Sequence, residues 1–359
     1  GCDTVCGTMT SGGTESILLA VLAARNYMCS TRGITEPEIV MAQSAHPAYL
    51  KAAEYFKIRL VTLPVGEGSG YRLTGAQVKR ALTRNTVLVV ASSPGYPVGV
   101  MDEVAEIAAV AHKRGVCVHV DCCLGGFVLP FARQLGYKVP PFHFECPGVT
   151  SISVDTHKFG MGMKGTSVVL HRDKERRSFQ FTSCANWSGG LYISPTMQGS
   201  RNGALIAVTW ASMMHIGEQG YLEHTRKIME AARALQAGIE KIDGVQVMGE
   251  PAMGVVGFRA GDPRALNIYK VNDLLTKAGW HLVALQFPPG LHMCITASNA
   301  GGMGRLVLDL ARAVKMLKDD PDCVAGGSAP VYGMAASTPD RATVADILRA
   351  YQSMACDVS

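Results

Sequence analysis

Strand-like and helix-like segments alternate along the first two thirds of this chain. Between residues 16 and 240, short runs of β-branched and apolar residues are separated by segments with a helical pattern. The runs Thr86–Ser92 and Val116–Asp121 are dominated by apolar residues, which is typical of strands buried on both faces. Strands of this kind occur in parallel sheets that helices cover on both sides. The sequence therefore predicts an α/β fold with a large, mostly parallel sheet.

The elements expected in this part of the chain can be given by range. Strands are expected at Glu38–Ala42, Arg59–Leu63, Thr86–Ser92, Val116–Asp121 and Val149–Val154. Helices are expected at Ile17–Cys29, Pro47–Phe56, Thr74–Leu82 and Asp102–Arg114, the last ended by Gly115. The stretch Ala204–Ile216 is almost wholly apolar, so we expect a buried helix there.

After about residue 240 the pattern changes to a mixture typical of a small α+β domain. Strands are expected at Val245–Met248, Gly254–Phe258, His281–Gln286 and His292–Thr296, and helices at Asn267–Ala278, Met303–Leu317 and Thr343–Met354. Val324–Pro339 is rich in Gly, Ala, Ser and Pro and predicts a loop. We therefore expect a large domain over residues 1–240 and a small C-terminal domain over residues 241–359.

The composition excludes several classes of protein. Hydrophobic residues make up 48% and charged residues 18% of the 359, which indicates a globular chain. No apolar run approaches the ~18 residues that span a bilayer. The net charge of +5 is spread along the chain without the basic, aromatic-rich stripe that nucleic-acid binding favours. The histidines lack the spacing of metal ligands, so no metal site is expected.

The cysteines and the first residue give two further expectations. The 11 cysteines are an odd number without a C-x-x-C pair, which favours reduced thiols in a cytosol-facing protein. Gly1 is not an initiator methionine, and a recognisable motif follows within ten residues. We expect the sequence to be part of a longer protein.

A lysine lies just beyond the expected strand Val149–Val154. Lys158 is held near the interior, and we expect desolvation there to lower its pKa. More of the amine would then be neutral and able to form a Schiff base with a carbonyl cofactor. The alternative is an ordinary loop lysine.

Ser11–Ser16, in the sequence Ser-Gly-Gly-Thr-Glu-Ser, opens the first expected helix. Its two glycines allow close backbone approach, Thr14 offers a hydroxyl, and free N–H groups at a helix start can hold a phosphate. The alternative is a plain helix start that Thr14 or Ser11 caps.

Other polar residues also follow expected strands. Asp121 ends one strand, where it could pair with a pyridinium nitrogen or simply cap a helix. His46 follows another and could stack on a flat ring, or be an ordinary surface or core histidine. His157 could add a phosphate contact, and Lys164 could bind an anion or be a solvated loop lysine. Together with Thr14 these placements supply every role of a pyridoxal phosphate site.

Six motifs carry a resemblance to a known family: Thr10–Ser16, Ser44–His46, His119–Phe127, Asp155–Gly160, Lys164–Gly165 and Gly199–Arg201. They resemble the sphingosine-1-phosphate lyase (sphinganine-1-phosphate aldolase) family, in the group II decarboxylase branch of pyridoxal-phosphate-dependent fold type I. The likeness runs from residue 1 to about residue 300. It implies a lyase that cleaves phosphorylated sphingoid bases to a long-chain aldehyde and phosphoethanolamine, in sphingolipid catabolism.

The resemblance also implies roles for single residues. Lys158 would hold the cofactor as a Schiff base, Asp121 would pair with the pyridine nitrogen, and His46 would stack over the ring. The phosphate would be held by Gly13, Thr14 and His157. Lys164 would assist catalysis or meet the substrate phosphate, while Cys123 and Tyr96 would line the substrate site.

The resemblance further implies a homodimer with shared active sites, because Ser200 would reach the phosphate of the neighbouring subunit's cofactor. It implies a membrane-anchored parent protein at the endoplasmic reticulum, facing the cytosol. Asn202 departs from the family, which usually has proline at that position. The family's upstream anchor and two upstream contacts would precede Gly1, so this part of the protein could be inactive by itself.

Two alternatives to the lyase stay open. One is an amino-acid decarboxylase of the glutamate or tyrosine type on the same fold, which would need an arginine for the substrate carboxylate. The other is a non-catalytic fragment that binds lipid phosphates or acts as a scaffold.

Overall fold

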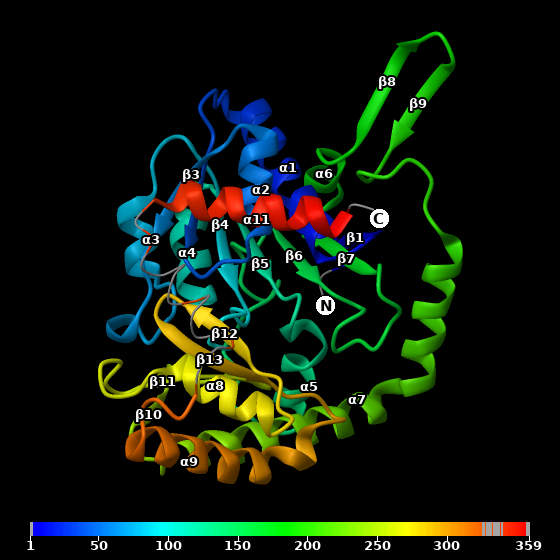
Figure 1. The fold of residues 1–359 in the computed structure, drawn as a ribbon. Helices are drawn as coiled ribbons and strands as arrows, with labels where there is room; N and C mark the ends of the chain where they lie inside the picture. The colour runs from blue at the N-terminus through cyan, green and yellow to red at the C-terminus, as the bar shows by residue number, and fades with distance from the viewer. Residues whose placement is uncertain (1–2, 325–326, 328–331, 333–337, 339, 357–359) are drawn as a thin grey trace. The chain divides into compact units, whose positions relative to one another are not determined.

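A seven-stranded sheet forms the centre of the larger of two units in the computed structural model (Figure 1). The structure describes residues 3–324, 327, 332, 338 and 340–356. The larger unit comprises Gly1–Ala232, Met248–Val256 and Ile295–Ala300, and the smaller one comprises Arg233–Val247, Gly257–Cys294 and Gly301–Ser359. The expected domain boundary at residue 240 stays a prediction.

The large sheet is mostly parallel, as predicted. Its strands are β1 Cys6–Thr10, β2 Glu38–Ala42, β3 Arg59–Leu63, β4 Thr86–Ser92, β5 Cys117–Asp121, β6 Ser151–Val154 and β7 Ser167–His171. The spatial order is β1-β7-β6-β5-β4-β2-β3. Strands β2 to β6 run parallel, whereas β7 runs antiparallel to both of its neighbours. The carboxyl ends of the parallel strands therefore meet at one edge of the sheet.

Helices cover both faces of this sheet. One face packs against α1 Gly13–Arg32 and α2 Ala48–Phe56, and the other against α3 Gly75–Ala81, α4 Val104–Arg114 and α5 Leu129–Gln134. The helix ends follow local chemistry. The Thr74 hydroxyl caps α3 by accepting from the Gln77 N–H, and Gly115 ends α4 in the left-handed conformation.

Several short elements were not predicted from the sequence. They are β1 and β7, the helix α5, the single-turn helix α6 Lys174–Ser178, and a hairpin of β8 Thr182–Trp187 and β9 Gly190–Ser194. The hairpin extends away from the seven-stranded sheet (Figure 1). Both of its strands are exposed except at Ser194. Three 3-10 turns complete the set, at Glu67–Ser69, Gly125–Phe127 and Ala300–Gly302.

The expected helix over Ala204–Ile216 forms the first part of α7 Gly203–Ile239, which is kinked at Gly217. The Asn202 side chain accepts from the Ala204 N–H and so caps its start. The expectation that this stretch is buried is wrong for the single chain. The large apolar side chains that remain exposed are Ile206, Val208, Trp210 and Met214. The reason is that this part of α7 lies beside the sheet layer rather than between packed elements (Figure 1).

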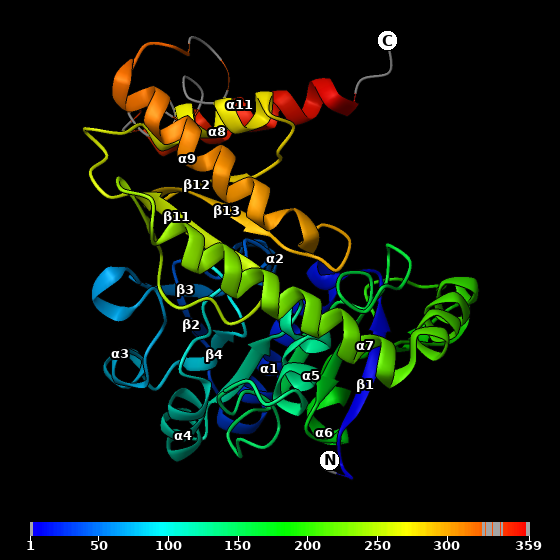
Figure 2. The same ribbon diagram turned by 90° about the horizontal axis from the view of Figure 1, so that it is seen from below.

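The smaller unit contains an antiparallel sheet of order β10-β11-β13-β12. Its strands are β10 Val245–Val247, β11 Val255–Ala260, β12 Val283–Gln286 and β13 Pro289–Cys294. The helices α8 Ile268–Lys277 and α9 Met303–Asp319 lie on one side of it (Figure 2). The helix α11 spans Arg341–Cys356. The predicted loop Val324–Pro339 falls almost wholly outside the described residues.

Candidate active site

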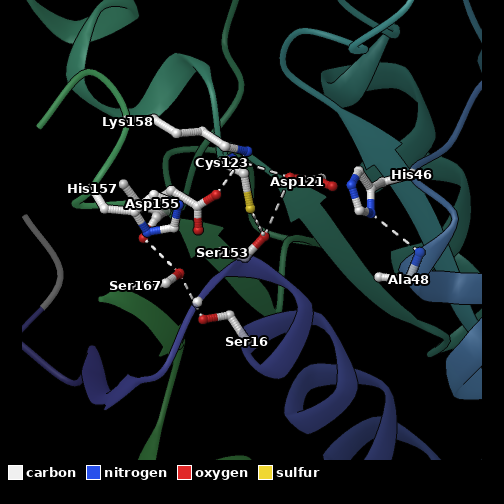
Figure 3. A network of polar contacts seen from close by, with 12 residues as sticks. Ser16, His46, Ala48, Asp121, Cys123, Ser153, Asp155, His157, Lys158 and Ser167 are labelled. Carbon is white, nitrogen blue, oxygen red and sulfur yellow. Dashed lines mark hydrogen bonds and ion pairs between the residues drawn. The ribbon is translucent and has the colours of Figure 1, made fainter. Parts of the chain in front are cut away.

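The edge where the parallel strands end carries most of the residues singled out in the sequence. His46 follows β2, Tyr96 follows β4, Asp121 ends β5, and Lys158 follows β6. The loop before α1 lies at the same edge, and Figure 3 shows Lys158, Asp155, Asp121, Cys123 and His46 around one space. This is the position where open α/β sheets bind ligands.

Asp121 is buried and held by three donors. Its Oδ1 accepts from the Cys123 N–H at 3.1 Å and from the Ser153 hydroxyl at 3.4 Å. Its Oδ2 lies 3.5 Å from the Tyr49 hydroxyl. The Cys123 thiol in turn donates to Ser153 Oγ at 3.3 Å. The carboxylate is thereby fixed in one orientation at the end of β5.

Lys158 is paired with a buried carboxylate. Its Nζ lies 2.7 Å from Asp155 Oδ2, and the side chains of Lys158 and Asp155 are 33% and 2% exposed. Burial lowers the pKa of Lys158, but the charge of Asp155, with smaller contributions from Cys123 and Asp121, outweighs it and leaves the pKa raised. The expectation of a lowered pKa is therefore wrong, because the sequence does not show that a carboxylate three residues earlier turns toward the amine.

The loop before α1 has the features of an anion site. The N-cap of α1 is Gly12, which offers no side chain to the free N–H groups of the first turn. Capping by Thr14 or Ser11 is thus excluded, and both of these residues are exposed. A Cβ atom on Gly13 would lie 2.7 Å from both carboxylate oxygens of Asp155, so only glycine fits there.

The two histidines at this edge have one ring nitrogen each fixed by the backbone. His157 Nδ1 donates to the Thr166 carbonyl oxygen, and His46 Nδ1 accepts from the Ala48 N–H at 3.1 Å. In each ring Nε2 is the nitrogen not used in these contacts. Both side chains are half-buried, which suits contact with a bound group.

Three predicted residues lie farther from the Asp155–Lys158 pair. Lys164 is exposed, and within the described part of the chain no hydrogen bond or ion pair joins it to the cluster. Tyr96 is exposed in the loop after β4. Ser200 is exposed and lines a pocket of about 300 Å³ together with Thr10, Ser11, Gly165, Thr166 and Arg201, among others.

Several residues at this edge were missed in the sequence. Asp155 and Ser153 contact Lys158 and Asp121, and Tyr49 reaches Asp121 from α2. Glu15 is buried and accepts from the N–H groups of Ser11 and Met197. The sequence does hold one signal: Ser153 and Asp121 both lie at the ends of adjacent expected strands, and the register places them opposite each other.

The arrangement fits a phosphorylated aldehyde cofactor. A glycine-only loop at a helix N-terminus suits the phosphate, Lys158 suits the aldehyde, and the fixed Asp121 carboxylate suits a protonated ring nitrogen. Among the described residues, no three His, Cys, Asp or Glu side chains gather as a metal site would require.

Comparisons with known proteins identify the family to which the chain belongs. A family model described as the pyridoxal-dependent decarboxylase conserved domain matches residues 2–261. Sphingosine-1-phosphate lyase of Arabidopsis thaliana is 49% identical over 344 residues, which are 96% of this chain and 62% of the plant protein. The chain thus spans about three fifths of the length of the curated relatives that it matches.

Solved structures lead to the same family. The Burkholderia pseudomallei sphingosine-1-phosphate lyase Bpss2021 is 41% identical with a TM-score of 0.84, covering 88% of this chain and 72% of that one. Oryza sativa TDC with PLP and tryptamine shares only the fold, at 17% identity and a TM-score of 0.73 over 88% of this chain and 71% of that one. The chain belongs to the pyridoxal-dependent decarboxylase family, within the branch of the sphingosine-1-phosphate lyases.

Proposed function

We propose that this chain is the catalytic part of a lyase that cleaves phosphorylated sphingoid bases, such as sphinganine 1-phosphate, to a long-chain aldehyde and phosphoethanolamine. The observation that carries the proposal is the cluster at the sheet edge, where Lys158, Asp121 and the Gly13 loop meet in a chain similar to known lyases. The proposed pathway is sphingolipid catabolism.

The residues have separate tasks in this reaction. Lys158 would hold pyridoxal phosphate through Nζ and give it up to the substrate amine. When bound, the cofactor would supply an electron sink for the pair freed from the substrate C2–C3 bond. Asp121 would pair with the protonated ring nitrogen, and His46 would lie against the ring. Gly13, Thr14 and His157 would hold the phosphate.

The remaining residues act on the substrate. A base takes the C3 hydroxyl proton as the C2–C3 bond breaks, which yields the aldehyde, and a proton delivered to C2 completes phosphoethanolamine. Lys164 is assigned either to the transfer of the hydroxyl proton or to the substrate phosphate, and its exposure suits contact with a ligand that enters from solvent. Cys123 and Tyr96 are assigned to the wall of the substrate site.

We also propose a homodimer in which Ser200 reaches the cofactor of the other subunit. Exposed apolar residues support this: Trp210 on α7 is 66% exposed, and Leu191 on the β8–β9 hairpin is 88% exposed. Glu15 accepts from Met197 N–H at 3.0 Å, which ties the segment leading to Ser200 to the phosphate loop.

The location of the parent protein is proposed on family resemblance alone, as membrane-anchored at the endoplasmic reticulum and facing the cytosol. Within the described residues, no helix is long and apolar enough to cross a membrane.

The first test uses the natural full-length protein and its Lys158→Ala variant. Replacement should abolish the visible absorbance of the bound cofactor and reduce aldehyde release from sphinganine 1-phosphate by about 10³-fold or more. Borohydride reduction of the unmodified protein should attach the cofactor to the peptide that contains Lys158. Lys174→Ala is the control, because Lys174 is exposed on α6.

Product analysis separates the alternatives. Carbon dioxide release from glutamate or tyrosine, without aldehyde release from sphinganine 1-phosphate, would replace the lyase by a decarboxylase. A colourless protein that borohydride leaves unlabelled would favour a non-catalytic role.

A further inference from the structure

A chain of buried polar side chains lies behind the Asp121 carboxylate, and the proposed function does not use it. His119 Nδ1 lies 2.9 Å from Ser151 Oγ, and His119 Nε2 lies 3.1 Å from Ser153 Oγ. Ser153 Oγ then contacts Asp121 Oδ1 at 3.4 Å. All four side chains are buried. The large majority of buried polar groups in proteins are hydrogen-bonded, and all four of these side chains are.

The sheet register builds this chain. His119 is paired with Ser151, and Asp121 is paired with Ser153, on the adjacent parallel strands β5 and β6. Residues two apart on a strand point to the same face, so all four side chains share one face of the sheet. The ring of Tyr49 on α2 covers His119 edge-on, with ring centroids 6.2 Å apart.

The direction of the hydrogen bonds can be worked out from the acceptors. An ionised Asp121 carboxylate can only accept, so the single hydroxyl proton of Ser153 is donated to it. The two lone pairs of Ser153 Oγ then accept from the Cys123 thiol and from His119 Nε2. His119 therefore carries its proton on Nε2, and Nδ1 accepts from the Ser151 hydroxyl.

His119 stays neutral in this arrangement. Burial lowers its pKa to about 4, although the nearby charge of Asp121 opposes the change. A neutral ring has one donor and one acceptor, which is what Ser153 and Ser151 require.

We propose that His119 is a positioning residue that, through Ser153, holds the Asp121 carboxylate in place and is itself fixed in the Nε2–H form. The role of Asp121 toward the pyridine nitrogen rests on the proposed function. The direction of the hydrogen bonds does not depend on the proposed function, and it can be measured in cofactor-free protein.

The first experiment measures the tautomer of His119 by long-range ¹⁵N–¹H correlation in histidine-labelled, cofactor-free protein. The unmodified protein should show Nε2–H. In Ser153→Ala, Nε2 loses its acceptor, so the proton should move to Nδ1 and be donated to Ser151. Ser93→Ala is the matched control, because Ser93 is buried and its hydroxyl has no hydrogen-bond partner in the described structure. An Nδ1–H ring in the unmodified protein, or an unchanged ring in a folded Ser153→Ala, would overturn the proposal.

The second experiment reads the effect on Asp121 through the bound cofactor, without substrate. Ser153→Ala weakens the hold on the carboxylate, so the cofactor's ring nitrogen should lose its proton more easily. With pyridoxal phosphate labelled with ¹⁵N in the ring, the pH transition of the ring nitrogen's chemical shift should move down by about one unit, a tenfold change in the protonation equilibrium. Ser93→Ala should leave the transition in place. An unmoved transition in Ser153→Ala would refute the positioning role. A protein that binds no pyridoxal phosphate would refute the proposed function instead, while the tautomer would still decide the direction of the hydrogen bonds.

Discussion

Among the neighbours of Lys158, Asp155 has the largest effect on its pKa. The carboxylate is almost wholly buried, and its Oδ1 accepts no hydrogen bond from the described residues. The negative charge of Asp155 therefore acts mainly on the amine of Lys158. An ammonium ion is a poor nucleophile, so this ion pair lowers the share of neutral, reactive amine at Lys158.

This pairing predicts the effect of Asp155→Asn on cofactor-free protein. The variant removes the largest influence that raises the pKa of Lys158 and leaves burial, which lowers it. The neutral amine should then be present at lower pH. The rate of reaction with pyridoxal, followed by absorbance between about pH 7 and 10, should rise by about tenfold near the lower limit. Asp173→Asn, which breaks an ion pair on α6, serves as control. An unchanged pH profile in Asp155→Asn would contradict this account.

The sequence predicted where the reactive residues lie better than what surrounds them. The positions of Lys158 and Asp121 could be predicted because Lys158 follows, and Asp121 ends, a strand whose apolar run is recognisable in the sequence. The Asp155 contact could not, since the direction in which a loop carboxylate turns depends on packing against Gly13, over a hundred residues away. Whether a residue lies at the end of a strand depends on the neighbouring sequence. The direction of a pKa shift depends on residues that can be far away in the sequence.

At the scale of elements, the sheet edge is fixed by polar side chains just outside the strands. Asp102 lies between β4 and α4, and its two carboxylate oxygens accept from Leu73 N–H and Ser92 N–H, both at 2.7 Å. Ser92 is the last residue of β4, directly before the loop that carries Tyr96. One buried carboxyl group therefore connects the end of a central strand to the segment before α3.

Asp102 also predicts a pH dependence of stability. Burial raises its pKa to about 7, although the two backbone N–H groups oppose this. The folded state then binds the proton more tightly than the unfolded state, whose pKa is near 3.9. Its contribution to the free energy of unfolding is complete below about pH 4 and is lost as the pH rises to about 7. In Asp102→Asn this slope should disappear, and overall stability should fall by about 1–3 kcal/mol because one backbone donor loses its acceptor. Urea unfolding at several pH values measures both effects. A slope equal to that of the unmodified protein would contradict the assignment to Asp102.

The elements that the sequence did not reveal were missed for different reasons. The strands β1 and β7 are short and lie together at one end of the sheet, and β7 was missed although it is partly buried. The β8–β9 hairpin is exposed along nearly its whole length, so no pattern of buried residues marks it. The prediction of a buried helix at Ala204–Ile216 was wrong because its apolar residues were expected to be buried within the single chain, where several are exposed.

At the scale of the whole molecule, some of the exposed apolar side chains gather on consecutive elements of the chain. One group of them lies on the β8–β9 hairpin and the first part of α7, the same stretch of chain that carries Ser200, while others lie elsewhere, such as Leu308 on α9 and Tyr351 on α11. Isolated exposed apolar residues are ordinary, but a concentration on consecutive elements marks an interface. The proposed dimer would cover this surface.

The dimer predicts the effect of a charge placed on α7. Trp210→Glu should convert the protein from dimer to monomer at micromolar concentration, since a carboxylate in an apolar interface is desolvated without a counter-ion. Sedimentation velocity measures the state directly. The control is Leu308→Glu, which replaces a similarly exposed apolar residue on α9 of the smaller unit. A Trp210→Glu variant that remains dimeric would exclude this surface as the interface.

The pairing of β1 with β7 sets the order in which the protein can fold. Thr10 is paired with Ser167, so the first strand finds its partner only after more than a hundred and fifty intervening residues have been synthesised. The loop that bears Gly13 follows β1 directly, and it cannot take its final position before that pairing forms. Closing so long a loop is slow. We therefore expect the phosphate loop to reach its final position late in folding. Pulsed hydrogen exchange during refolding should show the amide of Thr8 gaining protection after that of Val89 in β4.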